Sequence, residues 1–179
     1  WVLRPGGGTS SNLEGIIESW GVAFSVDGRM AAAVGGVFGP EERVIPYFVD
    51  FAERCIHHFG DLVTYWNTFN EPNVFALNAY LLGNFPPQER GRYRRANRVL
   101  RHMGQAHDIA YELIKTRYPQ APVGISLNTA WFDGQTWLGR RLANFMDRWF
   151  HWRTARHFEL VDFWGISYYA YIPFRPLPI

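Results

Sequence analysis

The sequence has little cysteine, little lysine and almost no net charge, and these shortages limit the disulfides and the charged partners that the protein could have. Cys55 is the only cysteine among 179 residues, so an internal disulfide is excluded and a reducing compartment fits. We therefore expect a cytoplasmic location. The 18 basic residues include one lysine and balance 16 acidic ones to +2, too small a charge to attract nucleic acid or an anionic membrane. No apolar run reaches the roughly 18 residues of a membrane-spanning helix.

The sequence is rich in hydrophobic and aromatic residues. Hydrophobic residues make up 47% and charged residues 19%, which excludes a disordered chain. Aromatic residues reach 17% and include eight tryptophans. Such rings either fill a core or bind flat, amphipathic partners such as sugars. The length is that of one domain with a substantial core.

Arginines gather in one segment, at positions 90, 92, 94, 95, 98 and 101. On a helix, Arg94, Arg98 and Arg101 fall on one side, which favours a solvated helix face over a track for phosphates. An aromatic, basic nucleic-acid binder is kept as an alternative. It predicts salt-dependent retention on DNA that is lost when the cluster is neutralised.

Hydrophobic spacing predicts three β/α units after residue 39. Helices are expected at about 40–60, 92–117 and 138–158, and strands at 62–69, 123–127 and 161–169. Before them, a short helix from Ser11 through Trp20 and a strand at 22–26, ended by a turn at Asp27-Gly28, are expected. Residues 31–36 are ambiguous. Alternating helices and strands indicate an α/β fold with a parallel sheet.

Polar residues follow the three predicted strands at their carboxyl ends. The first strand ends in Asn70-Glu71-Pro72, the second in residues 128–131, and the third in 167–169. In parallel sheets these ends meet at one edge, where ligands bind. A glutamate at the mouth of a buried strand is costly, and the following proline ends the ladder. Glu71 is therefore a catalytic candidate, while a solvated loop glutamate is the plainer interpretation.

The motifs resemble glycoside hydrolase family 1, the retaining β-glucosidases and β-galactosidases. They are Gly35-Gly36, Phe59-Gly60-Asp61, Trp66-x-Thr68-x-Asn70-Glu71-Pro72, Gly124-Ile125-x-Leu127-Asn128 and Asp162-Phe163-Trp164-Gly165-Ile166-x-Tyr168-Tyr169. The resemblance implies part of a (β/α)8 TIM barrel. It covers residues 36–179 of a single partial domain, 1–179, in which residues 1–35 are poorly assigned.

The resemblance also implies roles for individual residues. Glu71 is the general acid/base, and Asn70 hydrogen-bonds the sugar 2-hydroxyl. Tyr169 supports the nucleophile, while Asn128 and Trp131 line the aglycone side. The implied substrate is a small β-glycoside with a terminal glucose or galactose, hydrolysed without a cofactor or metal. His102 and His107 are five positions apart, which misses the spacing of a helical zinc site.

The departures from the family concern the second carboxylate. A retaining mechanism needs two carboxyl groups about 5 Å apart, and the family takes its nucleophile from a later strand. Asp133 is more simply a loop aspartate, and Asp162 starts its strand at the opposite end of the sheet. Ser167 replaces the family's usual asparagine, and the family's early His-His segment is missing. We therefore expect little activity from this chain alone; the alternative is a non-catalytic carbohydrate-binding fragment or pseudoenzyme.

Overall fold

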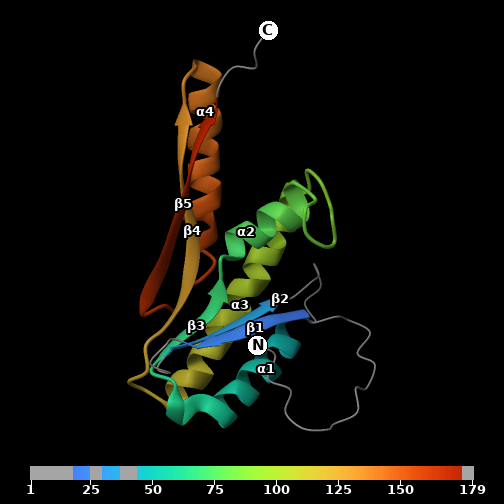
Figure 1. Cartoon of the computed structure of the whole chain (residues 1–179). Helices are drawn as coiled ribbons and strands as arrows, with labels where there is room; N and C mark the ends of the chain where they lie inside the picture. Colours follow the sequence, from blue (N-terminus) through green and yellow to red (C-terminus); the bar gives the residue numbers. More distant parts are fainter. Residues whose placement is uncertain (1–17, 25–29, 37–43, 175–179) are drawn as a thin grey trace.

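A computed structural model describes the backbone of residues 18–24 and 30–36 and the full structure of residues 45–174 (Figure 1). The elements follow in the order β1 (Glu18–Phe24), β2 (Met30–Gly36), α1 (Val44–Phe59), the 3-10 turn η1 (Gly60–Leu62), β3 (Tyr65–Asn70), α2 (Pro72–Ala76), the π-helical turn η2 (Leu77–Leu81), α3 (Tyr93–Arg117), β4 (Val123–Gly134), α4 (Trp137–Asp147), the π-helical turn η3 (Arg148–Arg153) and β5 (Phe163–Phe174).

The strands form one sheet in the order β1-β2-β3-β4-β5. Strands β2, β3, β4 and β5 pair in parallel, as the β/α alternation predicts, while β1 and β2 pair antiparallel. The carboxyl ends of β3, β4 and β5 therefore point the same way. The sheet therefore has an edge formed by the carboxyl ends of these strands, where the sequence predicts the site.

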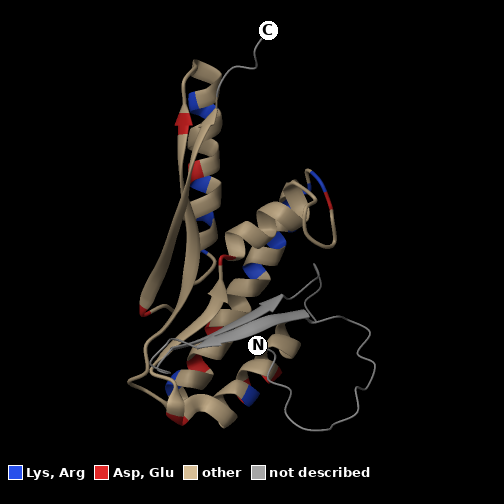
Figure 2. Cartoon of the chain, viewed as in Figure 1, with Lys and Arg blue, Asp and Glu red and all other residues tan. Residues whose placement is uncertain are grey.

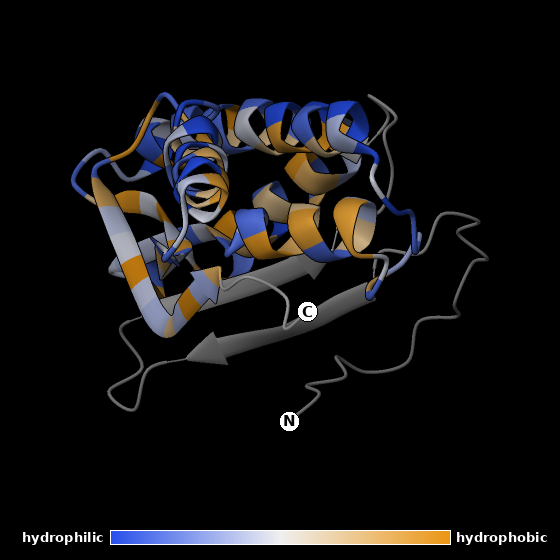
Figure 3. Ribbon diagram, turned by 90° about the horizontal axis from the view of Figure 1, so that it is seen from above, coloured by the Kyte–Doolittle hydropathy of each residue, from blue (hydrophilic) through white to orange (hydrophobic). Residues whose placement is uncertain are grey.

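The core lies between the sheet and helices α1 and α3. Phe48 of α1 stacks on Phe69 of β3 with ring centroids 4.5 Å apart, and Leu100 of α3 and Ile125 of β4 are fully buried in the same cluster. The helices mix hydrophobic and hydrophilic residues along their length, as expected where one helix face is buried (Figure 3). One face of β3 and β4 is therefore buried against these helices.

The second half of β4, β5 and α4 extend past the end of β3 as an arm (Figure 1). Pairing of β3 with β4 ends at Ser126, whereas pairing of β4 with β5 continues to Gly134. Both strands are longer than predicted. The predicted strand at 123–127 is the mostly buried start of β4, and the predicted strand at 161–169 covers the start of β5, where partly buried and exposed residues alternate. The remaining residues of both strands lie in the arm, where the pattern of burial is irregular.

The start of the chain differs from expectation. The predicted helix through Trp20 is wrong for residues 18–20, which belong to β1; there, pairing with β2 overrides a weak capping signal. The ambiguous residues 31–36 form most of β2. The turn at Asp27-Gly28 and the proposed helix start at Pro40 lie outside the described residues.

None of the helices in the described part is long and apolar enough to cross a membrane. Within the same ranges, no three histidine, cysteine, aspartate or glutamate side chains come together in a group able to hold a metal ion.

Candidate active site

Glu71 occupies the turn between β3 and α2 in a left-handed backbone conformation, with φ 52° and ψ 52°. For a residue with a Cβ this conformation costs about 1–2 kcal/mol, so its surroundings must enforce it. The Glu71 N–H donates to Ser126 C=O at 2.7 Å, and the Glu71 C=O accepts from Val74 N–H at 3.0 Å. Pro72, which has no backbone N–H, suits the first position of α2, where an N–H would have no acceptor within the helix. The backbone thus holds a partly buried carboxylate at the sheet edge.

A β-bulge turns Asn70 to the face of the sheet away from the helices. Asn67 pairs with Gly124 but Asn70 pairs with Ser126, so β3 carries an extra residue. Thr68 and Phe69 are therefore both buried, at 8% and 4% exposure, although they are neighbours in sequence. Bulges often re-aim side chains next to active sites. Without this one, alternation would place Asn70 with Thr68 against the helices.

The face of the sheet away from the helices is polar. Ile125 and Leu127 point into the helical core, so Ser126 and Asn128, which alternate with them, point the other way. Asn128 pairs with Ser167 on β5. A Cβ on Gly165, the partner of Ser126, would lie 2.4 Å from Ser126 Oγ, as expected for positions that share a face. The face therefore presents amides and hydroxyls beside Glu71.

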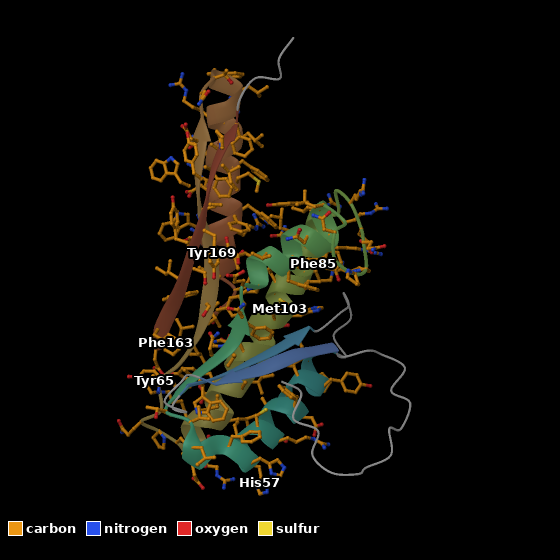
Figure 4. All side chains as sticks on the ribbon, in the orientation of Figure 1. His57, Tyr65, Phe85, Met103, Phe163 and Tyr169 are labelled. Carbon is orange, nitrogen blue, oxygen red and sulfur yellow. The ribbon has the colours of Figure 1, made fainter. Side chains whose placement is uncertain are left out.

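Tyr169 and Trp131 lie further along the two strands of the arm. Tyr169 is the extra residue of a second bulge, since Tyr168 pairs with Thr129 and Ala170 with Ala130. Its side chain is 75% exposed, and it lies well along β5 from Phe163 (Figure 4). Trp131 is 63% exposed and lies five positions past Ser126, about 16 Å along a strand. Of the predicted site residues, Trp131 is the furthest from Glu71 along the sheet.

Asn73 is a site residue that the sequence analysis missed. It is fully buried, and its Nδ2 donates to the C=O of Asn128 at 2.7 Å and of Phe150 at 3.2 Å. Its Oδ1 accepts from Asn128 N–H at 3.3 Å. One amide thus ties the helix that follows Glu71 to β4 and to η3. The only sequence signal was an asparagine two positions after Glu71, inside an apolar segment.

Replacing Asn73 by alanine is expected to lower the free energy of unfolding by about 2–3 kcal/mol, because two buried carbonyls and one N–H lose their partner. Urea unfolding followed by circular dichroism measures the loss. Asn78→Ala is the matched control: Asn78 Nδ2 donates at 3.0 Å to Val74 C=O, and Asn78 Oδ1 accepts an exposed hydrogen bond from Asn84 Nδ2 at 2.9 Å. This variant should lose less than about 1 kcal/mol. Equal losses would mean that the buried hydrogen bonds of Asn73 contribute no more to stability than the hydrogen bonds of Asn78.

His107 supports β3 from the helical side. Its Nδ1 lies 2.5 Å from Thr68 Oγ1, and its Nε2 lies 2.6 Å from Leu160 C=O. A carbonyl only accepts, so Nε2 carries the proton and Nδ1 accepts from the Thr68 hydroxyl. Burial lowers the pKa of His107, although the hydrogen bond to Leu160 acts in the opposite direction. The lowered pKa favours the neutral form of the imidazole. His107 is therefore a buried residue with a hydrogen-bonding role.

The two aspartates weighed as a second carboxylate lie far from Glu71. Asp133 is seven positions past Ser126 on β4, about 23 Å along the strand, and accepts a 2.6 Å hydrogen bond from Tyr171. Asp162 precedes β5 at the opposite end of the sheet, where Val123 N–H donates to it at 2.8 Å and Lys115 Nζ lies 2.6 Å away. Neither forms the pair that a retaining mechanism needs.

The surroundings of Asp162 determine the protonation state of its carboxyl group. Partial desolvation would raise the pKa of this carboxyl, but hydrogen bonds from Lys115, Val123 and Tyr111 outweigh it and lower the pKa. Asp162 is therefore ionised at neutral pH and joins α3 to the start of β4. It is a structural carboxylate.

Comparisons with known proteins agree with this geometry. The sequence model of Glycosyl hydrolase family 1 matches residues 30–168. Beta-glucosidase 47 of Arabidopsis thaliana is 33% identical over 99 residues, which cover 48% of this chain and 18% of that protein. A 6-phospho-beta-galactosidase of Clostridium acetobutylicum is 40% identical over 81 residues, covering 45% of this chain and 17% of that protein.

A solved structure shows the same arrangement of elements. The crystal structure of the hyperthermophilic beta-glucosidase from Pyrococcus furiosus superposes with a TM-score of 0.64 and 26% identity, covering 77% of this chain and 30% of that one. The predicted fold class is confirmed: the chain is an α/β protein of parallel β/α units that form part of a TIM barrel. It belongs to glycosyl hydrolase family 1. It spans about a fifth of the length of the two relatives described above.

Proposed function

We propose that this chain supplies the acid/base half of a retaining β-glycosidase site, with Glu71 as the general acid/base. The observation that carries the proposal is the strained backbone of Glu71 at the carboxyl edge of β3, with a hydrogen bond across to Ser126. A carboxyl group on a backbone that is fixed at this edge suits proton transfer to a glycosidic oxygen. The substrate class is a small molecule with a terminal β-linked sugar, glucose or galactose.

The neighbouring residues take positioning roles in this proposal. Asn70 pairs with Ser126 on the polar face of the sheet, next to Glu71, and suits a hydrogen bond to the sugar 2-hydroxyl. Such a bond strengthens as charge develops in the transition state. Asn128 and Trp131 line the aglycone side, and Tyr169 supports a nucleophilic carboxylate supplied by a later barrel strand. The Trp131 ring, being exposed, is open to a pyranose face.

A second candidate is carbohydrate binding without catalysis by the 179-residue chain. The remote positions of Asp133 and Asp162 favour it, because neither supplies a carboxyl group about 5 Å from Glu71. The two candidates share a site and differ only in whether a nucleophile completes it.

The test is hydrolysis of 4-nitrophenyl β-glucoside by the chain alone. We expect turnover far below the range of about 1–1000 per second that is typical of enzymes. A change in tryptophan fluorescence with glucose or cellobiose, without product, would support the binding candidate. Turnover within the enzymatic range that is abolished by Glu71→Gln would contradict the expectation and show that a second carboxylate is present.

A further inference from the structure

A basic, aromatic groove lies where α4 and η3 pass the first turn of α3. It is lined by Tyr93, Phe145, Asp147, Arg148, Trp149, Trp152, Arg153, Arg156 and His157, and its volume is about 820 Å³. That volume falls within the range of small-molecule sites in proteins, about 300–1,000 Å³. The lining residues take no part in the glycosidase site proposed above.

The groove carries an excess of uncompensated positive charge. Within the described ranges, no carboxylate lies at ion-pair distance from Arg148, Arg153 or Arg156. The acidic residue of the lining, Asp147, is already engaged by His151 Nδ1 at 3.0 Å. Basic residues lie along both α3 and α4 (Figure 2). Three guanidinium groups around one hollow favour an anion, above all one with several oxygens.

His157 contributes a buried polar atom that lacks a partner. Its Nε2 is shielded from solvent and has no hydrogen bond to any residue of the described part. Burial lowers the pKa of His157, and the nearby Arg153 and Arg101 lower it further. The imidazole is therefore neutral in a positive environment, and a bound anion would reverse that preference. A buried polar atom of this kind requires an explanation.

The groove walls include closely packed backbone and exposed aromatic rings. Gly104 of α3 lies so close to the His157 backbone that a Cβ would come 1.7 Å from His157 O, so the two segments are in direct contact. The Arg153 guanidinium lies 5.9 Å from the centre of the Tyr93 ring, which orients it. Trp152 is 66% exposed beside the arginines, and its flat face is open to a ring.

We propose that this groove binds a small oxyanion ligand, a sulfate- or phosphate-type group. Arg148, Arg153 and Arg156 bind the oxygens, and protonation of His157, which belongs to the groove lining, adds a further positive charge. The group is either free or the ester of a planar ring that stacks on Trp152. Arg101 lies near His157 and contributes further positive charge. Asp147, at the end of α4, contributes a negative charge to the groove.

The test is a calorimetric titration of the chain with phenyl sulfate and with inorganic sulfate, at constant ionic strength set with chloride. Both probes keep their charge between pH 6 and 8. Arg153→Gln and Arg156→Gln should each weaken binding at least tenfold. Arg94→Gln, at an exposed α3 position outside the lining, should change it less than twofold. Tighter binding of phenyl sulfate, lost in Trp152→Ala, assigns a ring ester, whereas equal affinities assign a free oxyanion.

A second measurement uses the link between anion and proton. A bound anion stabilises the imidazolium of His157 and so raises the pKa of this residue, which means that affinity should rise as the pH is lowered. In His157→Gln the affinity should not depend on pH. Circular dichroism confirms that each variant is folded. Absence of saturable binding, or binding that is unchanged in both arginine variants or independent of pH in the wild type, would overturn the proposal.

Discussion

Replacing Glu71 by glutamine is expected to lower glycoside hydrolysis by about 10²–10⁴-fold in a protein with a complete site, the usual contribution of a general acid or base. Glutamine keeps the size of the side chain but has no proton to donate to the leaving oxygen. The Glu71 backbone is held by Ser126 and by α2, so the variant should fold normally. The loss should therefore be in chemistry and not in stability.

The measurement needs the barrel strands that this chain does not contain. A hybrid in which residues 30–168 replace the matching segment of the Pyrococcus furiosus enzyme provides them. The loss should be largest for phenyl β-glucoside and smaller for 2,4-dinitrophenyl β-glucoside, because dinitrophenolate leaves without protonation. This dependence on the leaving group distinguishes an acid catalyst from a residue that only binds sugar.

Asp133→Asn is the matched control in the same hybrid. Asp133 lies about 23 Å along β4 from the level of Glu71, so its removal should leave kcat/KM within about twofold. Two outcomes would reject the assignment of Glu71: an equal loss with both aryl glycosides, or a larger effect of Asp133→Asn than of Glu71→Gln.

Replacing Gly104 by alanine is expected to lower the free energy of unfolding by at least about 2 kcal/mol. The added Cβ would lie 1.7 Å from His157 O and 2.6 Å from His157 C, both backbone atoms that no side-chain rotation can move. Alanine's better helix propensity, about 1 kcal/mol, offsets only part of this. Urea unfolding of the 179-residue chain measures the change.

Gln105→Ala is the control for this substitution, since Gln105 is the next residue of α3 and is exposed. It should alter stability by no more than about 0.5 kcal/mol. A Gly104→Ala variant as stable as the wild type would mean that α3 and the turn after η3 are further apart than in this structure. Such a result would also remove the rigid wall that places His157 in the proposed anion groove.

The sequence was sufficient for the elements whose hydrophobic pattern is strong. The long helix predicted at 92–117 is observed as α3, Tyr93–Arg117, because its apolar stripe repeats over many turns. The parallel order of β3, β4 and β5 followed from the helices between them. The arginine face also agrees with expectation in its exposure: Arg94, Arg98 and Arg101 are exposed. Whether nucleic acid binds there was not tested, and the absence of nucleic-acid binding stays a prediction, as does the cytoplasmic location.

Local sequence was insufficient where tertiary pairing decides. Residues 18–20 carry a helix-like signal but belong to β1, where Glu18 and Ser19 pair with β2. The bulges after Asn67 and at Tyr169 follow from how β3 and β5 match β4, and no spacing within one strand encodes them. Asn73 is similar: its three hydrogen bonds join segments up to 77 positions apart, so a single-sequence pattern contains no trace of them.

By itself, the sequence determined the family, through the motifs that resemble it and the match of the family model to residues 30–168. It also determined the β/α alternation and the residue types at the sheet edge, since these depend on local composition and periodicity. Only the tertiary structure decided that Asn70 faces away from the helices, that Glu71 is held in a left-handed turn by a neighbouring strand, and that Asp133 lies about 23 Å further along β4. The physical reason is that register and bulges are set by hydrogen bonds between strands distant in sequence, and these bonds determine which side chains share a face.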